Sequence, residues 1–236
     1  MNHFMRSFYA VLLCLINTLS VASDLIDFET SANQMSSYYR AYIFFDGDQK
    51  YKASIVGITS KSSDYDALLS EKPQLLNQWH TLVGLVNRVL EDDSNIRNVN
   101  TQSHWEVMLG NLNRTLEEEV ENGSYNKSFD DPKSKDYIRL LLLRMEKTLA
   151  LYMALTNPAG GLGISAESPD LDVKIIEISD MLAVVDSQSD SLNRVVKRWS
   201  FVEKILLKYN TNTAPYIVLH GYGKMRTDLN AHLASL

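Results

Sequence analysis

Arg144 is the residue whose surroundings in the sequence point most directly to chemistry. It follows four consecutive leucines, residues 140–143, so a helix through this segment would place its guanidinium partly inside the protein. A buried arginine needs an anionic partner. Two kinds of partner fit this position. One is an internal acid such as Asp180 or Asp186, and the other is a small anionic ligand held by two parallel hydrogen bonds between helices.

If Arg144 binds a ligand, polar residues of the first expected helix should lie beside it. Gln34 and Arg40 are the candidates for this role. Several tyrosines lie near the same positions and could line a pocket, although buried aromatic side chains pack in a core by default. The hypothetical ligand site therefore consists of Arg144, Gln34 and Arg40.

The residue patterns of common enzymes and metal sites are absent from the sequence. Four histidines lie beyond residue 23, at His80, His104, His220 and His232, and none belongs to a His-Glu-x-x-His pattern. No Gly-x-Ser-x-Gly nucleophile elbow occurs. The glycine-rich residues 160–163 follow a helical pattern rather than a strand, which predicts a loop and not a phosphate cradle. We therefore expect no catalytic residue, no metal and no cofactor.

The composition bounds the compartment and the partners. A formal net charge of −6 argues against nucleic acid and against anionic lipid surfaces. Arg6, the apolar run 7–19 and the small residues 20–23 form the pattern of a secretory signal peptide. Cleavage after residue 22 or 23 would remove the only cysteine, Cys14, which fits a periplasmic or secreted protein of a Gram-negative bacterium. An uncleaved N-terminal anchor is the alternative.

The elements that must position these residues are helices. Strand-like alternation is nearly absent, whereas apolar residues recur at steps of three and four between breakers. The pattern predicts an all-α, up-and-down bundle of about eight helices. Their expected ranges are roughly 25–45, 49–69, 72–92, 101–121, 135–156, 169–186, 190–209 and 213–235. The fourth helix has Thr101 or Ser103 as its expected N-cap, with Glu106 completing a capping box.

An internal repeat is the second feature of the sequence. The first and fifth expected helices match at Met35 and Met145 and at Tyr42 and Tyr152, each pair 110 residues apart. The third and seventh match at two tryptophans, Trp79 and Trp199, within a shared apolar pattern. We interpret the repeat as a duplicated four-helix unit, residues 24–122 and 130–236. Eight unrelated amphipathic helices with one coincident tryptophan are the alternative.

The repeat resembles bacterial sensor domains of type IV pilus chemotaxis transducers and of nitrate sensors. These domains carry a helix with an Arg-Met pair, then an amphipathic helix with a tryptophan, often in two copies. Arg144-Met145 followed by Tyr152 resembles the first of these helices, and Gln34-Met35 followed by Tyr42 resembles it with glutamine in place of arginine. In the nitrate sensors the arginine meets the anion, so the resemblance implies a ligand role for Arg144.

The expected function is therefore non-enzymatic. The first hypothesis is a periplasmic, sensor-like module, free of a membrane span, that binds either a small ligand, with anions among the candidates, or a membrane-bound signalling protein. The second is an interaction or adaptor module whose exposed helix faces dock a partner, with no small ligand. A hydrolytic or metal enzyme is the least favoured class. The sequence leaves open the ligand, the pathway and whether the protein forms a homodimer.

Overall fold

The computed structural model describes residues 24–92, 98–122, 131–156, 171–185, 189–209, 211 and 213–236. All regular secondary structure in these ranges is helical, which confirms the expected all-α bundle. The N-terminal helix comprises residues 24–44. The others are α2 (Gln49–Thr59), α3 (Asp64–Leu69), α4 (Pro73–Glu91), α5 (Val99–Asn122), α6 (Lys135–Thr156), α7 (Leu171–Ala183), α8 (Asp190–Leu206) and α9 (Pro215–Ser235). The expected signal peptide, residues 1–23, lies outside the described residues.

Local signals explain where several helices begin and end. The N-terminal helix stops where Asp46 and Gly47 take positive φ angles of 54° and 87°, and the Gly47 N–H donates to the Tyr42 carbonyl at 2.8 Å. Asp48 then caps α2, because its Oδ1 accepts the Lys50 N–H at 2.8 Å. Pro73 occupies the first turn of α4, where its missing N–H is not needed.

Two boundaries differ from those expected. The second expected helix, 49–69, is divided into α2 and α3 by a turn at residues 60–63. The capping box at Ser103 and Glu106 was wrong, since α5 begins earlier, at Val99. Asn98 precedes it, and its Oδ1 accepts the backbone N–H of Asn100 at 3.0 Å. Glu106 thus lies inside the helix, and its carboxylate is free to reach another helix.

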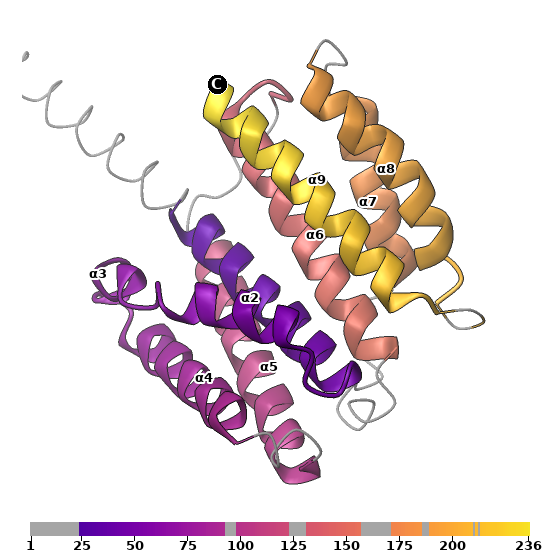
Figure 1. The fold of residues 1–236 in the computed structure, drawn as a ribbon. Coiled ribbons are helices and arrows are strands. Elements are labelled where there is room, and N and C mark those ends of the chain that lie inside the picture. Colours follow the sequence, from indigo (N-terminus) through magenta and orange to yellow (C-terminus); the bar gives the residue numbers. More distant parts are fainter. Residues whose placement is uncertain are drawn as a thin grey trace, which may run out of the picture.

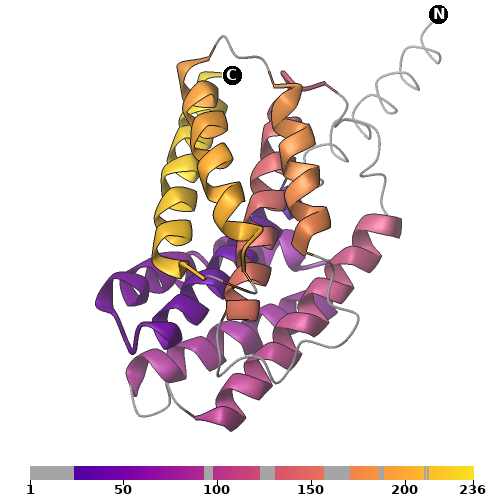
Figure 2. The same cartoon turned by 90° about the vertical axis from the view of Figure 1, so that its right-hand side faces the viewer.

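The helices gather in two groups (Figure 1). Helices α6 to α9 form a closed four-helix arrangement in which α6 contacts α7 and α9, and α8 contacts the same two helices. In Figure 2 they stand side by side above the helices of the first group. The N-terminal helix lies between the groups, because its side chains reach α4, α5, α6 and α9.

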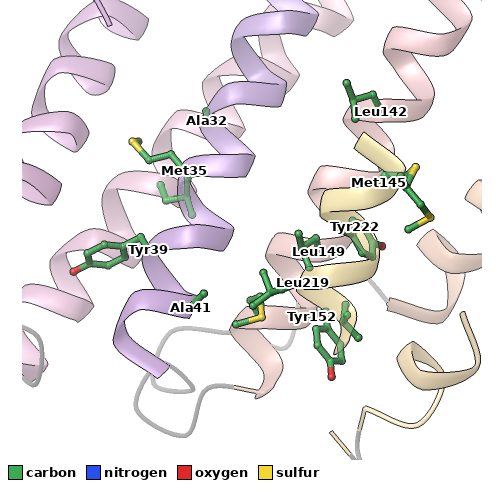
Figure 3. Close-up of a cluster of buried hydrophobic side chains, with 14 of the residues drawn as sticks. Ala32, Met35, Tyr39, Ala41, Leu142, Met145, Leu149, Tyr152, Leu219 and Tyr222 are labelled. Carbon is green, nitrogen blue, oxygen red and sulfur yellow. The ribbon is translucent and has the colours of Figure 1, made fainter. Parts of the chain in front are cut away.

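One hydrophobic core runs through both groups. Figure 3 shows Met35 and Tyr39 on the side of the N-terminal helix away from α6, and Met145 and Tyr152 of α6 near Tyr222 of α9; all five belong to one continuous cluster of buried side chains. All of these side chains are at most 1% exposed. The two predicted units, residues 24–122 and 130–236, therefore share a core.

The repeat positions are all buried. Trp79, Trp199, Met35, Met145, Tyr42 and Tyr152 are at most 3% exposed. The two tryptophans have different partners, however. Trp199 donates its indole N–H to Ser179 Oγ of α7 at 2.8 Å. Trp79 packs edge-to-face against Phe28 and Tyr65 instead. The shared burial agrees with a duplication, which remains a hypothesis.

Candidate ligand-binding site

Arg144 does not lie in the bundle interior, contrary to the sequence-based expectation. Its side chain is 42% exposed and forms an ion pair with Glu177 of α7, which is 41% exposed. The neighbouring Leu143 is buried, whereas the long arginine side chain extends past the apolar surface to water. The partner is an acid, as in the first of the two alternatives, but it is neither Asp180 nor buried. Asp186 lies outside the described residues.

Arg40 is buried, and its charge is already neutralised by the protein. Its Nε donates to Glu106 Oε1 at 3.1 Å, and its Nη2 donates to Glu106 Oε2, so the two groups form a forked pair between the N-terminal helix and α5. Its Nη1 donates to Ser36 Oγ and, at 3.4 Å, to the Ala150 carbonyl. A guanidinium with this set of acceptors is a structural link and has no donor directed at a ligand.

Gln34 lies at a surface hollow of about 340 Å³ to which neither Arg40 nor Arg144 contributes, so the three expected site residues do not converge. Three helices line the hollow. They supply Asp27, Thr30, Ser31 and Gln34 from the N-terminal helix, Lys135, Arg139 and Leu142 from α6, and Asn230 and Leu233 from α9. The steps of three and four within each set place these residues on one helical face.

The hollow has an excess of positive charge. It contains two cations, Lys135 and Arg139, and one anion, Asp27. Arg139 Nε lies 3.6 Å from Asp27 Oδ1, and its Nη1 lies 3.6 Å from Asp136 Oδ1. These separations are longer than those of a charge-assisted hydrogen bond, so both ion pairs are loose. Burial raises the pKa of the Asp27 carboxyl, and Arg139 opposes that shift only in part.

The polar groups of the hollow fall into two classes. Thr30 Oγ1 donates to the Ile26 carbonyl at 2.7 Å, and Ser31 Oγ lies 2.6 Å from the Tyr65 hydroxyl, so these hydroxyls are used within the protein. Gln34, Lys135 and Asn230 form no side-chain hydrogen bond or ion pair with any residue that the structure describes. Two amides and one ammonium group therefore face the hollow with donors available to a ligand.

A second polar cluster lies deeper, where α6, α9 and the N-terminal helix meet. Arg226 donates through Nε and Nη2 to the two carboxylate oxygens of Glu146, each at 2.7 Å, and through Nη1 to the Tyr38 hydroxyl. Burial lowers the pKa of Arg226, but Glu146 and Tyr38 outweigh burial and raise it. Burial, helped by Glu146, also raises the pKa of the Tyr222 hydroxyl. The pair of Arg226 and Glu146 is complete in itself, which favours a structural role.

Sequence reasoning missed most of the hollow. Of its nine lining residues only Gln34 was a candidate. The buried face of each helix can be deduced from the spacing of its apolar residues, but which faces meet depends on the packing of three helices that are distant in the sequence. Within the described ranges, no group of three or more histidine, cysteine or carboxylate side chains could hold a metal ion. No helix there is long and apolar enough to cross a membrane.

Comparison with known proteins adds no relative: the chain matches no protein-family model, no curated protein and no solved structure. The resemblance to pilus-type sensor domains therefore rests on the Arg-Met and tryptophan positions alone. Those positions lie in the core or at the edge of α6, outside the hollow. The chemistry of the site has to be argued from its own residues.

Proposed function

We propose that this protein is a non-enzymatic helical module that binds a small anionic ligand in the hollow between the N-terminal helix, α6 and α9. The observation that carries the proposal is the set of donors in that hollow. Arg139 lies 3.6 Å from both Asp27 and Asp136, and Lys135, Gln34 and Asn230 form no side-chain hydrogen bond or ion pair with any described residue. The volume of about 340 Å³ is at the lower end of the range for ligand pockets, which favours a small molecule.

Binding there would act on the arrangement of helices. The hollow is formed by the N-terminal helix, α6 and α9. The same three helices also meet at the buried pair of Arg226 and Glu146, to which Tyr38 adds its hydroxyl. A ligand that contacts all three helices would stabilise one relative position of them, as a sensor module requires. Periplasmic location and a membrane-bound signalling partner belong to the same proposal, and the apolar N-terminal run 7–19 supports them.

The proposal is tested by the response of the melting temperature to small anions. Acetate, succinate, glutarate, phosphate and sulfate are added in turn to the protein purified after expression of the full chain. A ligand that binds only the folded protein raises the melting temperature with increasing concentration. The double variant Arg139→Ala and Lys135→Ala should lose the response. Arg144→Ala is the matched control, because it removes an arginine from α6 outside the hollow and should keep it.

A second candidate function is docking of a partner protein without a small ligand. The observation that favours it is a pair of exposed apolar residues on α7, Val173 and Ile176, which are 51% and 57% exposed, with Val184, 57% exposed, directly after the helix end. The spacing of three residues places Val173 and Ile176 on one face of the helix. Absence of any response to the anion panel, together with self-association or partner binding that Ile176→Lys abolishes, would favour this function over the first.

A further inference from the structure

We propose, on the premise that the hollow binds an anion, that its ligand class is the small amino dicarboxylates: molecules with two carboxylates and one ammonium group on a short carbon chain. The premise is the proposed function above. The inference concerns which anion fits, and it is carried by the positions of Asp27, Arg139 and Lys135. Each of the three charges lies on a wall of the same hollow.

The first step is the proximity of opposite charges in the site. Asp27 Oδ1 and Arg139 Nε are 3.6 Å apart on two facing helices. A simple anion that binds Arg139 would lie close to the Asp27 carboxylate and be repelled by it. A ligand with an ammonium group next to its carboxylate avoids this repulsion, since the carboxylate can meet Arg139 while the ammonium meets Asp27. An α-amino acid carries its two charged groups on adjacent carbons, which matches this spacing.

The second step is the additional cation. Lys135 precedes Arg139 by four residues, so the two side chains start about 6 Å apart along the same face of α6. Its ammonium group has no carboxylate partner among the described residues. A second carboxylate two or three carbons from the first would span this separation. The site then has two cations and one anion, and the ligand has two anions and one cation, so every charge is paired.

The third step is the rest of the lining. The amides of Gln34 and Asn230 are available to carboxylate oxygens from the N-terminal helix and from α9. Leu142 and Leu233 supply apolar surface, against which the short methylene chain of the ligand can lie. The protein as a whole carries a net charge of −6, so a general attraction for anions does not explain binding here. Selectivity for one anion over another must therefore come from the individual ion pairs and hydrogen bonds in the hollow.

The pKa shift of Asp27 agrees with this arrangement. Burial raises the pKa of Asp27 in the free protein, where its nearest cation is only loosely placed. A bound ammonium group would favour the ionised carboxylate and lower that pKa. Binding of an amino dicarboxylate should therefore weaken as the pH falls and Asp27 becomes protonated, whereas binding of a dicarboxylate without an ammonium group should not weaken for this reason.

The experiment is a titration, by calorimetry, of the protein expressed from the full chain with L-glutamate, L-aspartate, glutarate and L-glutamine. Glutarate lacks the ammonium group of glutamate, and glutamine replaces its second carboxylate by an amide. Glutamate or aspartate should bind at least about tenfold more tightly than glutarate and than glutamine, since a hydrogen bond to a charged group contributes about one order of magnitude in affinity. Asp27→Asn should remove the preference over glutarate, and Lys135→Gln should remove the preference over glutamine.

The outcomes separate this inference from its premise. If glutarate binds as tightly as glutamate and Arg139→Ala weakens both, the hollow is an anion site and the amino dicarboxylate class is wrong. If neither these molecules nor the inorganic anions bind, the proposed function fails as well. If glutamate binds and neither Asp27→Asn nor Arg139→Ala changes its affinity, the hollow is not the site. Arg144→Ala serves as the control for loss of charge on α6 and should bind glutamate as the unmodified protein does.

Discussion

Arg226 and Glu146 form a forked ion pair that joins α9 to α6 in the core, with both N–H···O distances at 2.7 Å. The side chains are 13% and 1% exposed. Tyr38 of the N-terminal helix adds its hydroxyl to the cluster, and the guanidinium carbon lies 5.2 Å from its ring centroid. One arginine thus connects three helices, and these are the three that form the candidate ligand site.

Removal of either partner of this pair should destabilise the protein strongly. Arg226→Met leaves the Glu146 carboxylate buried without a cation, and Glu146→Leu leaves the guanidinium without an anion. Each should lower the free energy of unfolding by about 3–5 kcal/mol. The double variant should lose much less than the sum of the two, because no unpaired charge remains. Urea denaturation of the four proteins measures this, and single losses below about 1 kcal/mol would contradict the prediction.

The ion pair of Arg144 and Glu177 is exposed, unlike the buried pair of Arg226 and Glu146. The side chains of Arg144 and Glu177 are each about two-fifths exposed, so water and salt screen the pair. Arg144→Ala should therefore lower the free energy of unfolding by less than about 1 kcal/mol in the absence of any ligand. Denaturation at low and at high salt checks the prediction, and the small difference should shrink further at high salt. A loss of several kcal/mol would mean that the arginine is buried after all.

Trp199 is predicted to contribute through its packing more than through its hydrogen bond. The residue is 3% exposed, and its indole N–H donates to Ser179 Oγ at 2.8 Å. Trp199→Ala should lower the free energy of unfolding by about 3–5 kcal/mol. Ser179→Ala removes the acceptor of the indole N–H together with the hydrogen bond that the Ser179 hydroxyl donates to Glu203 Oε1 at 2.7 Å, yet it leaves the ring packed and should lower the free energy of unfolding by only about 1 kcal/mol. If Trp79→Ala matches Trp199→Ala, the result supports equivalent positions in a duplicated unit; a tryptophan loss under about 1 kcal/mol argues against it.

Helix ranges depend on residues close together in the sequence, whereas the contacts between helices depend on residues far apart. The helical period and the breakers predicted the class of fold and most helix ranges, because the apolar residues of an amphipathic helix recur at steps of three and four and so identify its buried face. Pairs between distant residues were not predictable in this way. Arg40 and Glu106 are 66 residues apart, and Arg226 and Glu146 are 80 apart. Nothing in the surrounding sequence distinguishes these arginines from those that point to water.

Arg144 illustrates the same limit from the other side. The four leucines before Arg144 predicted burial, yet its side chain reaches the surface, where it pairs with Glu177 of α7. An arginine is long enough to leave an apolar segment while its Cα stays within it. The hollow was missed because its charges are ordinary surface residues until three helices bring them together. Only Gln34 was anticipated, and it was assigned to a site that does not form.

Alkaline pH should weaken the fold through its buried tyrosines. Burial raises the pKa of Tyr51 to about 12 from 10.0, and Asp48 adds to the shift. The folded state then holds the phenolic proton more tightly than the unfolded state, so this stabilisation is complete below pH 10 and is lost between pH 10 and 12. The free energy of unfolding should fall over this window, and it should fall less steeply in Tyr51→Phe. Equal slopes in the two proteins would contradict the assignment to Tyr51.

Two glycines of α9 should respond in opposite directions to the same substitution. A Cβ at Gly221 would lie 2.6 Å from Val202 Cγ2 of α8, whereas a Cβ at Gly223 would meet nothing within 4 Å. Both positions gain helix propensity from alanine, so Gly223→Ala should raise the free energy of unfolding by up to about 1 kcal/mol. Gly221→Ala should lower it by about 1–3 kcal/mol, because α8 and α9 must separate or repack at a buried valine.

A double variant tests whether the contact with Val202 is the cause. Val202→Ala removes the methyl group that a Cβ at Gly221 would meet, at the expense of a small cavity. Combined with Gly221→Ala, it should cost less than the sum of the two single losses, and the difference measures the steric conflict. Gly223→Ala combined with Val202→Ala should be additive and serves as the control. Additivity in both double variants would show that the approach of α8 to α9 does not depend on Gly221.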